Sequence, residues 1–221
     1  MNNEPRTPGL RNSENGLALL MTLLLTSLLT TLGLALMLLS TGEVWLGAAY
    51  RTSEELSYAA DAAIARVQID LARAVDWTPL LAAGGPASAF NDGAALPQLT
   101  DGSRIDLNAE TAVLQARTDA LYGSANPDRP VWRLFAHAPL SRLASGPLPP
   151  AIYIAAWIAD DVEDGDGNVL SDANGRVYVQ AEAFGPAGAR RGVRSTFARA
   201  AGAGPGGAPS AVQLLIWREQ R

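Results

Sequence analysis

The fold of this chain is decided near its N-terminus, where residues 17–39 read LALLMTLLLTSLLTTLGLALMLL. No charged residue occurs between Leu17 and Gly42. A helix rises about 1.5 Å per residue, so roughly 20 apolar residues cross the ~30 Å hydrocarbon core of a bilayer. The segment therefore predicts a membrane-spanning helix over residues 17–42.

The end of this apolar run argues against a cleaved secretory signal. Such a signal has an apolar region of about 7–15 residues followed by a small-residue cleavage site. The run here is longer, and residues 38–43, LLSTGE, offer no such site. We therefore expect the helix to remain in the mature protein, either as a simple signal anchor or as the stem of an assembly.

The segment before the helix is short and polar, and it ends in Gly16 directly before Leu17. Its charged residues are Glu4, Arg6, Arg11 and Glu14. Because glycine has no Cβ, we expect the backbone at Gly16 to stay extended and open to a protease. A polar leader, a glycine and an immediate apolar helix resemble the class III leader that prepilin peptidases read. The resemblance implies cleavage after Gly16 on the cytoplasmic side, which removes residues 1–16 and keeps the helix.

The helix is predicted to continue beyond the membrane as an amphipathic half over residues 43–76. No proline occurs between Val44 and Val75, and apolar residues recur every three or four positions among charged ones. These apolar positions are Leu56, Ala60, Ala63, Ile64, Val67, Leu71 and Val75. The residue before a proline is disfavoured in a helix, so we expect the helix to end within residues 76–79, DWTP.

Residues 50–66 read YRTSEELSYAADAAIAR. Together with the glycine-led apolar run, this segment resembles the N-terminal region of PilX-type minor pilins in the type IV pilin-like (pseudopilin) family, over about residues 11–75. The resemblance implies a structural subunit that waits in the inner membrane, with its N-terminus cytoplasmic and its head periplasmic. The subunit would then join a type IV pilus or a type II secretion-like pseudopilus. Its implied partners are other pilin or pseudopilin subunits, a prepilin peptidase, an inner-membrane assembly platform and membrane lipid.

The resemblance also assigns residues to the assembly stem. These are Met21, Leu24, Leu28 and Leu32. Met21 is the fifth residue after the implied cut, where most major pilins have a glutamate. A buried carboxylate in lipid is costly unless it is paired, so methionine eases insertion but removes a contact that sets register. The methionine favours a minor subunit, and it also fits a plain anchor that never polymerises.

Residues 77–221 predict a separate head of mixed structure. Its β-prone and alternating runs predict strands at Val131–Ala138, Ala151–Ile158, Arg176–Phe184, Arg191–Ala198 and Val212–Trp217. Residues 104–117 predict one strand or a short helix. The remaining segments are predicted as loop (80–102), turns (121–130) and a flexible Gly/Pro loop (201–210). We therefore predict an α+β fold in which a small antiparallel sheet packs on the amphipathic half of the helix.

An acidic loop lies between two of the predicted strands. Residues 160–168 read DDVEDGDGN, and calcium prefers closely spaced oxygen ligands on tightly turning backbone. The candidate calcium ligands are Asp160, Asp161, Asp164, Asp166, Asn168 and Asp172. The loop is not an EF-hand, because Val169 and Gly175 stand where that motif has glycine and glutamate. Asp, Asn and Gly are also ordinary turn residues, so a hydrated turn without an ion is the alternative.

Composition excludes several function classes. The net charge is −5 and the pI about 4.9, which argues against a nucleic-acid ligand, because phosphate binding needs a basic footprint. The chain has no cysteine and a single histidine, His137, which removes cysteine-based sites and most catalytic triads. We expect His137 to be structural and the protein not to be an enzyme.

Two alternative functions remain open. One is a single-pass membrane-tethered periplasmic domain that binds a ligand, calcium or cell wall and does not polymerise. The other is a tethered hydrolase that uses carboxylates. The acids of residues 160–166 fit it poorly, because they crowd one loop instead of facing each other at the roughly 5–10 Å separations of glycoside hydrolysis.

Two further features have a structural interpretation. The arginines at 190, 191 and 194 predict protection of an edge strand, with a contact to a neighbouring acidic head as the alternative. Trp157 and Trp217 are expected to be core or interface anchors.

Overall fold

The computed structural model describes residues 11–93, 95–99, 101–143, 152–199 and 212–220. The chain divides into two units, Met1–Tyr50 and Arg51–Arg221. The first ten residues of the predicted leader and the predicted loop 201–210 lie outside the described residues.

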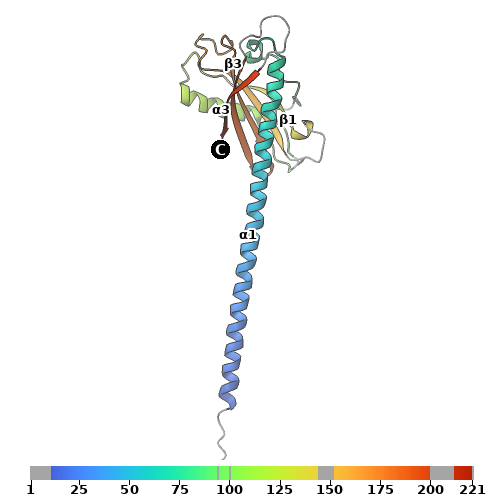
Figure 1. Cartoon of the computed structure of the whole chain (residues 1–221), viewed down its shortest axis with the longest axis vertical. Helices are drawn as coiled ribbons and strands as arrows, with labels where there is room; N and C mark the ends of the chain where they lie inside the picture. The colour runs from blue at the N-terminus through green and yellow to red at the C-terminus, as the bar shows by residue number, and fades with distance from the viewer. Residues whose placement is uncertain (1–10, 94, 100, 144–151, 200–211, 221) are drawn as a thin grey trace, which may run out of the picture. The chain divides into compact units, whose positions relative to one another are not determined.

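The described part of the first unit is helical and belongs to α1, Arg11–Arg73 (Figure 1). Its apolar side chains are exposed throughout, and Leu38 is the most exposed of its leucines at 75 %. Its threonine hydroxyls donate to carbonyl oxygens one turn earlier, as Thr30 does to Thr26 at 2.7 Å. These hydroxyls are therefore satisfied within the helix itself, as a segment surrounded by lipid requires.

The second unit is built around a five-stranded antiparallel sheet with the strand order β1-β2-β3-β4-β5. The strands are β1 (Arg133–Pro139), β2 (Tyr153–Asp160), β3 (Arg176–Phe184), β4 (Arg190–Arg199) and β5 (Val212–Gln220). Each strand pairs with the next one along the chain. This arrangement confirms the predicted α+β class and the five predicted strands, which differ from prediction by a few residues at their ends.

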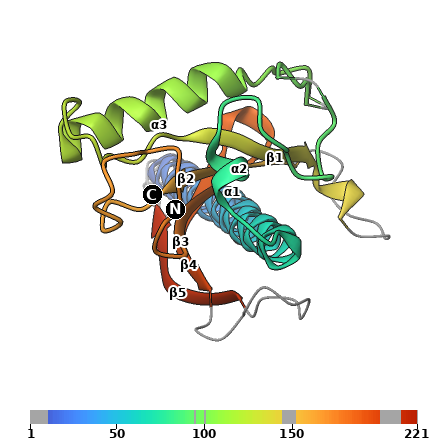
Figure 2. The same cartoon turned by 90° about the horizontal axis from the view of Figure 1, so that it is seen from above.

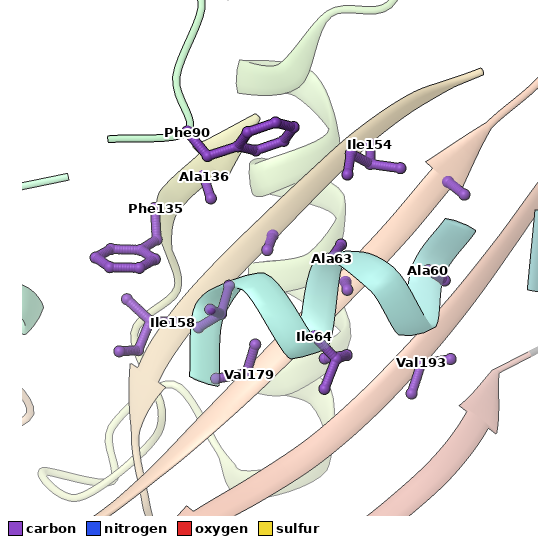
Figure 3. Packing of buried hydrophobic residues seen from close by; sticks show 14 of the residues in the cluster. Ala60, Ala63, Ile64, Phe90, Phe135, Ala136, Ile154, Ile158, Val179 and Val193 are labelled. Carbon is purple, nitrogen blue, oxygen red and sulfur yellow. The ribbon is translucent and has the colours of Figure 1, made fainter. Parts of the chain in front are cut away.

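One face of the sheet packs on the C-terminal part of α1. The buried residues of this part are Leu56, Ala59, Ala60, Ala63, Ile64, Val67 and Leu71. They share one cluster with inward-facing residues such as Ile154, Val179 and Val193, and the short alanine side chains hold the helix close to the strands (Figure 3). Six of the seven predicted apolar positions are thus confirmed, whereas Val75 is 85 % exposed and lies beyond the helix.

α1 ends at Arg73, before the predicted end, and polar side chains satisfy carbonyl groups in its last turn and just beyond it. The indole Nε1 of Trp77 donates to the carbonyl of Leu71 at 3.0 Å. Arg199 donates to the carbonyls of Ala74, at 3.3 Å, and Val75, and its guanidinium lies 4.5 Å from the centre of the Trp77 ring. The arginine thereby also places a positive charge at the negative end of the helix dipole.

Pro79, which was expected to stop the long helix, instead lies in the first turn of a short helix, α2 (Thr78–Leu81). A proline is tolerated there because the first N–H groups of a helix have no intrahelical partner.

α3, Leu107–Tyr122, covers the opposite face of the sheet over β1 and β2 (Figure 2). Its buried leucines, Leu107 and Leu114, share a second cluster with Trp132, Tyr153, Ala155, Trp157 and Ala159. The carboxylate of Asp106 accepts from two N–H groups of its first turn at 3.0 Å each, and Gly123 ends it with φ +85°. The prediction for residues 104–117 therefore missed the length of this helix.

The two edges of the sheet differ. A segment of residues 88–92 runs along β1, where the N–H of Ser88 donates to the carbonyl of Phe135 at 2.9 Å. Within the described ranges, no strand pairs with the outer edge of β5. β4 is therefore an inner strand, and the prediction that its arginines protect an edge strand is wrong.

Candidate functional site

The residues assigned to processing and assembly lie in the part of α1 that belongs to the first unit. Leu17, Met21, Leu24, Leu28 and Leu32 are between 55 % and 65 % exposed. In the part of the chain that the structure describes, one helix is long and apolar enough to cross a membrane, judged by length and composition. The exposed leucines give this helix the surface that a lipid-facing segment needs.

Gly16 lies inside α1 and not in extended backbone, so the prediction of an extended junction is wrong. No proline separates Arg11 from Leu17, and a helix propagates at low cost once it has formed. No heavy atom lies within 4 Å of the position that a Cβ on Gly16 would take. Cleavage at this junction therefore requires local unwinding, which glycine makes easier than other residues do.

The same helix has a second face of small residues that the sequence analysis did not identify. Its members are Ala18, Thr22, Thr26, Thr30 and Gly33, spaced four, four, four and three apart. Residues at these spacings share one side of a helix, and small side chains there allow close helix–helix approach in lipid. The four-residue spacing of the threonines in the sequence indicates this face.

Two exposed aromatic residues follow the apolar run and were also missed. Trp45 is 74 % and Tyr50 is 70 % exposed. Tryptophan and tyrosine concentrate where a spanning helix leaves the hydrocarbon core for the headgroups. Their place just after residues 17–42 is the one expected for the boundary of a span.

The candidate metal site is the loop between β2 and β3. One carboxylate oxygen each from Asp160, Asp164 and Asp166 lies within 4.8 Å of the others. Asp160 is the last residue of β2 and is 4 % exposed, while Asp166 is exposed on the loop. Three of the six predicted ligands are therefore brought together.

The other three predicted ligands accept hydrogen bonds elsewhere in the loop. Asp161 accepts from the side chain of Asn174 at 2.7 Å, and Asn168 accepts from the N–H of Leu170 at 3.3 Å. Asp172 accepts from the backbone N–H groups of residues 175 and 176 at 2.7 and 3.1 Å. These bonds fold the loop, and the converging carboxylates of Asp160, Asp164 and Asp166 also accept from backbone N–H groups, those of residues 161, 173 and 168.

Burial raises the pKa values of three carboxyl groups of this loop, those of Asp160, Asp161 and Asp172. It raises the pKa of Asp160 to about 8, with the N–H of Asp161 opposing the shift and the neighbouring acids adding to it. A cation between Asp160, Asp164 and Asp166 would favour their charged forms, so the arrangement is chemically suited to a hard cation such as calcium.

His137 is a buried residue of β1. Its Nδ1 lies 2.8 Å from the hydroxyl of Tyr153 and 3.2 Å from the carboxylate of Asp92. Burial lowers the pKa of His137, and Asp92 acts in the opposite direction. Trp157 is a core residue, whereas Trp217 is 49 % exposed on β5, where its Nε1 donates to Asp61 at 3.0 Å.

The three arginines of β4 have different environments. Arg190 forms an ion pair with Glu110 at 3.3 Å, and Arg191 lies 3.9 Å from Glu219. Arg194 instead lies over the ring of Trp132, with its Cζ 5.0 Å from the ring centre. The sequence analysis grouped these arginines as one cluster, but on β4 two of them pair with different glutamates and the third lies over a tryptophan ring.

No protein-family model, curated protein or solved structure matches this chain.

Proposed function

We propose that this chain is a non-enzymatic minor pilin or pseudopilin, a structural subunit of a type IV pilus or a type II secretion-like filament. In this proposal its leader is removed after Gly16 on the cytoplasmic side of the inner membrane. Residues 17–42 then anchor the subunit with its head in the periplasm until the helix packs among the stems of other subunits.

The observation that carries the proposal is the contrast between the two parts of α1. In its C-terminal part an apolar face is buried against the sheet, for example Val67 at 0 % exposure. In the first unit, by contrast, leucines are exposed on every side of the helix. Such a surface needs an apolar environment from outside the chain, and both lipid and neighbouring stems supply one.

Exchange between these two environments is physically reasonable. Lipid tails and a bundle of apolar stems are similar solvents for residues 17–39, so transfer between them need not expose leucine to water. The hydroxyls of the span are bonded within the helix, for example Thr41 to Met37 at 2.8 Å, and so demand no new partner during transfer. The resemblance of residues 11–75 to PilX-type minor pilins supports the same assignment.

The test is the mature N-terminus. We expect co-expression of the full chain with a prepilin peptidase to give a product that begins at Leu17, read by N-terminal sequencing. Gly16→Val should block the cut, because a β-branched side chain occupies the site of close protease approach. Gly9→Val, in the same leader, is the matched control and should be cut normally. An uncut wild-type chain, or one cut beyond Leu39, would contradict the proposal.

A second candidate function, a membrane-tethered domain that binds calcium, is favoured by the convergence of Asp160, Asp164 and Asp166. It predicts a higher melting temperature of the purified full chain in calcium, since a ligand that binds only the folded state stabilises it by about 2.7 kcal/mol at 100 times its Kd. The variant Asp164→Asn/Asp166→Asn should lose this shift, and Glu54→Gln, on the exposed side of α1, should keep it. A wild-type melting temperature that does not respond to calcium would exclude this candidate.

A further inference from the structure

The sheet places two arginines side by side, and neither forms an ion pair with a carboxylate among the described residues. Arg194 of β4 and Arg218 of β5 are direct cross-strand partners, so their side chains lie on the same face. This is the face that α3 covers over β1 and β2, because Arg194 lies over Trp132 of the second core cluster. Like charges directly opposite each other destabilise a sheet unless something compensates them.

Contacts within the chain hold Arg194 in place without an ion pair to its guanidinium. Its Nε donates to the side-chain oxygen of Gln180 at 3.0 Å, and its guanidinium lies over Trp132. Both partners are neutral. Among the described residues no carboxylate lies within 4.0 Å of the guanidinium of Arg194 or Arg218.

The two nearby acids do not fill this role. Glu219, next to Arg218, is on the opposite face of the sheet, where it lies 3.9 Å from Arg191. Glu182 of β3 is on the same face as Arg194, but its direct partner on β4 is Gly192, and among the described residues it forms no ion pair with Arg194. Neither of these two acids is therefore within ion-pair distance of the guanidinium groups of Arg194 and Arg218.

The chain itself carries matching carboxylates on a different surface. Asp164 and Asp166 lie in the acidic loop between β2 and β3, and Asp166 is exposed. The one arginine that forms an ion pair with the described part of this loop, Arg176, is bonded to Glu163 at 2.8 Å. The loop therefore carries net negative charge. The arginine pair carries net positive charge.

We propose that Arg194 and Arg218 form a docking site for Asp164 and Asp166 of a second copy of this chain. The two surfaces are different, so the contact is heterologous: each copy offers its loop to one neighbour and its arginines to another. Heterologous contacts build rings or open helical filaments, which is the type of assembly that the proposed function requires. The inference rests on that function for its filament context, and on charge complementarity for its partner.

A cross-linking experiment tests the geometry directly. Because the chain has no cysteine, only the introduced cysteines can form a disulfide. Full-length copies with different tags carry either Arg218→Cys or Asp166→Cys and are co-expressed in membranes under mild oxidation. We expect a disulfide-linked dimer that contains both tags. The matched control replaces Arg218→Cys by Arg104→Cys, another exposed arginine, and should give no more than background. Equal cross-linking of both pairs, or dimers of the Arg218→Cys copy alone, would overturn the proposal.

A complementation experiment tests the charges. In low salt, Arg218→Glu alone and Asp166→Arg alone should each weaken self-association of the detergent-solubilised full chain by about tenfold or more. An equimolar mixture of the two variants should associate again, because the intact loop of the first meets the intact arginines of the second. A mixture as weak as the single variants would overturn the inference. Leader cleavage at Leu17 is measured separately, so the proposed function can stand while this contact fails.

Discussion

His137 makes the stability of the head depend on pH in a predictable direction. Burial lowers its pKa, while the unfolded chain takes up a proton near the ordinary value of about 6.5. Below that pH the unfolded state binds more protons than the folded state, so the free energy of unfolding falls as pH drops from 7 towards 5. One proton contributes at most about 1.4 kcal/mol per pH unit.

The control for this prediction is His137→Gln, which keeps a polar side chain without a titrating ring. The charged or titratable groups in contact with the ring are Asp92 and Tyr153, and Arg142 acts on Tyr153. Other groups, Asp160 among them, titrate in both proteins and cancel in the difference between the two pH profiles. Urea unfolding of the full chain in detergent at several pH values measures this difference, and parallel profiles would contradict the prediction.

Removal of two buried hydroxyl groups should change the stability of the protein in different directions. The Oγ of Ser195 is buried without a hydrogen-bond partner among the described residues, whereas the Oγ1 of Thr118 accepts from the Nε1 of Trp132 at 2.7 Å. Ser195→Ala removes an unsatisfied group, so stability should stay the same or rise by up to about 1 kcal/mol. Thr118→Val leaves a buried indole N–H unpaired and should cost about 1–3 kcal/mol. Denaturant midpoints that fall equally for both variants would contradict this account.

The residues of the acidic loop show how far sequence reasoning reaches at this scale. Composition and spacing identified the loop, and three of its six candidate ligands do converge. The sequence did not separate Asp160 from Asp161, although successive residues of a strand point to opposite sides. Asp160 is the last residue of β2 and its neighbour is bonded to Asn174 instead. To distinguish Asp160 from Asp161, the end of β2 must be known to within one residue.

At the scale of elements, close contact between α1 and the sheet makes small residues essential on one side of the helix. Ala60 is fully buried against the strands, and Ala65 lies on the exposed side of the same helix. Ala60→Leu should overpack this layer and lower the free energy of unfolding by about 1–3 kcal/mol. Ala65→Leu is the matched control and should have little effect, because both residues favour helix. Equal unfolding midpoints for the two variants would show that the alanines are not what sets the helix–sheet distance.

The elements differ in how well the sequence predicted them, and for physical reasons. The C-terminal part of α1 was predicted because one face is buried along its length, which produces a clear 3.6-residue period. For residues 104–117 the sequence left a strand or a short helix open and missed the length of α3, because only Leu107, Leu114 and Thr118 of this helix are buried and its pattern is weak. Its signal lay at the ends, where Asp106 begins and Gly123 terminates a run without glycine or proline. The inner position of β4 depends on pairing with β5, which no local pattern encodes.

For the whole molecule, a single charge in the span should separate anchoring from assembly. An arginine at the centre of a spanning helix costs about 2.5–3.5 kcal/mol on insertion, and each leucine contributes about 0.3–0.6 kcal/mol in favour. The leucine-rich segment 17–39 can absorb that cost, and an arginine in lipid is further relieved by snorkelling and water defects. We therefore expect the Leu28→Arg chain to remain in the membrane fraction.

Packing among apolar stems offers an arginine no comparable relief, because a buried charge without a partner costs several kcal/mol. In the cells that encode the chain, Leu28→Arg should therefore be lost from sheared filaments while its membrane level stays near that of wild type. Leu28→Met keeps the volume of the side chain and should leave both fractions unchanged. Filaments that contain the arginine variant at wild-type levels would show that Leu28 is not buried in a bundle of stems. A wild-type chain that is absent from filaments would instead favour the tethered, non-polymerising domain.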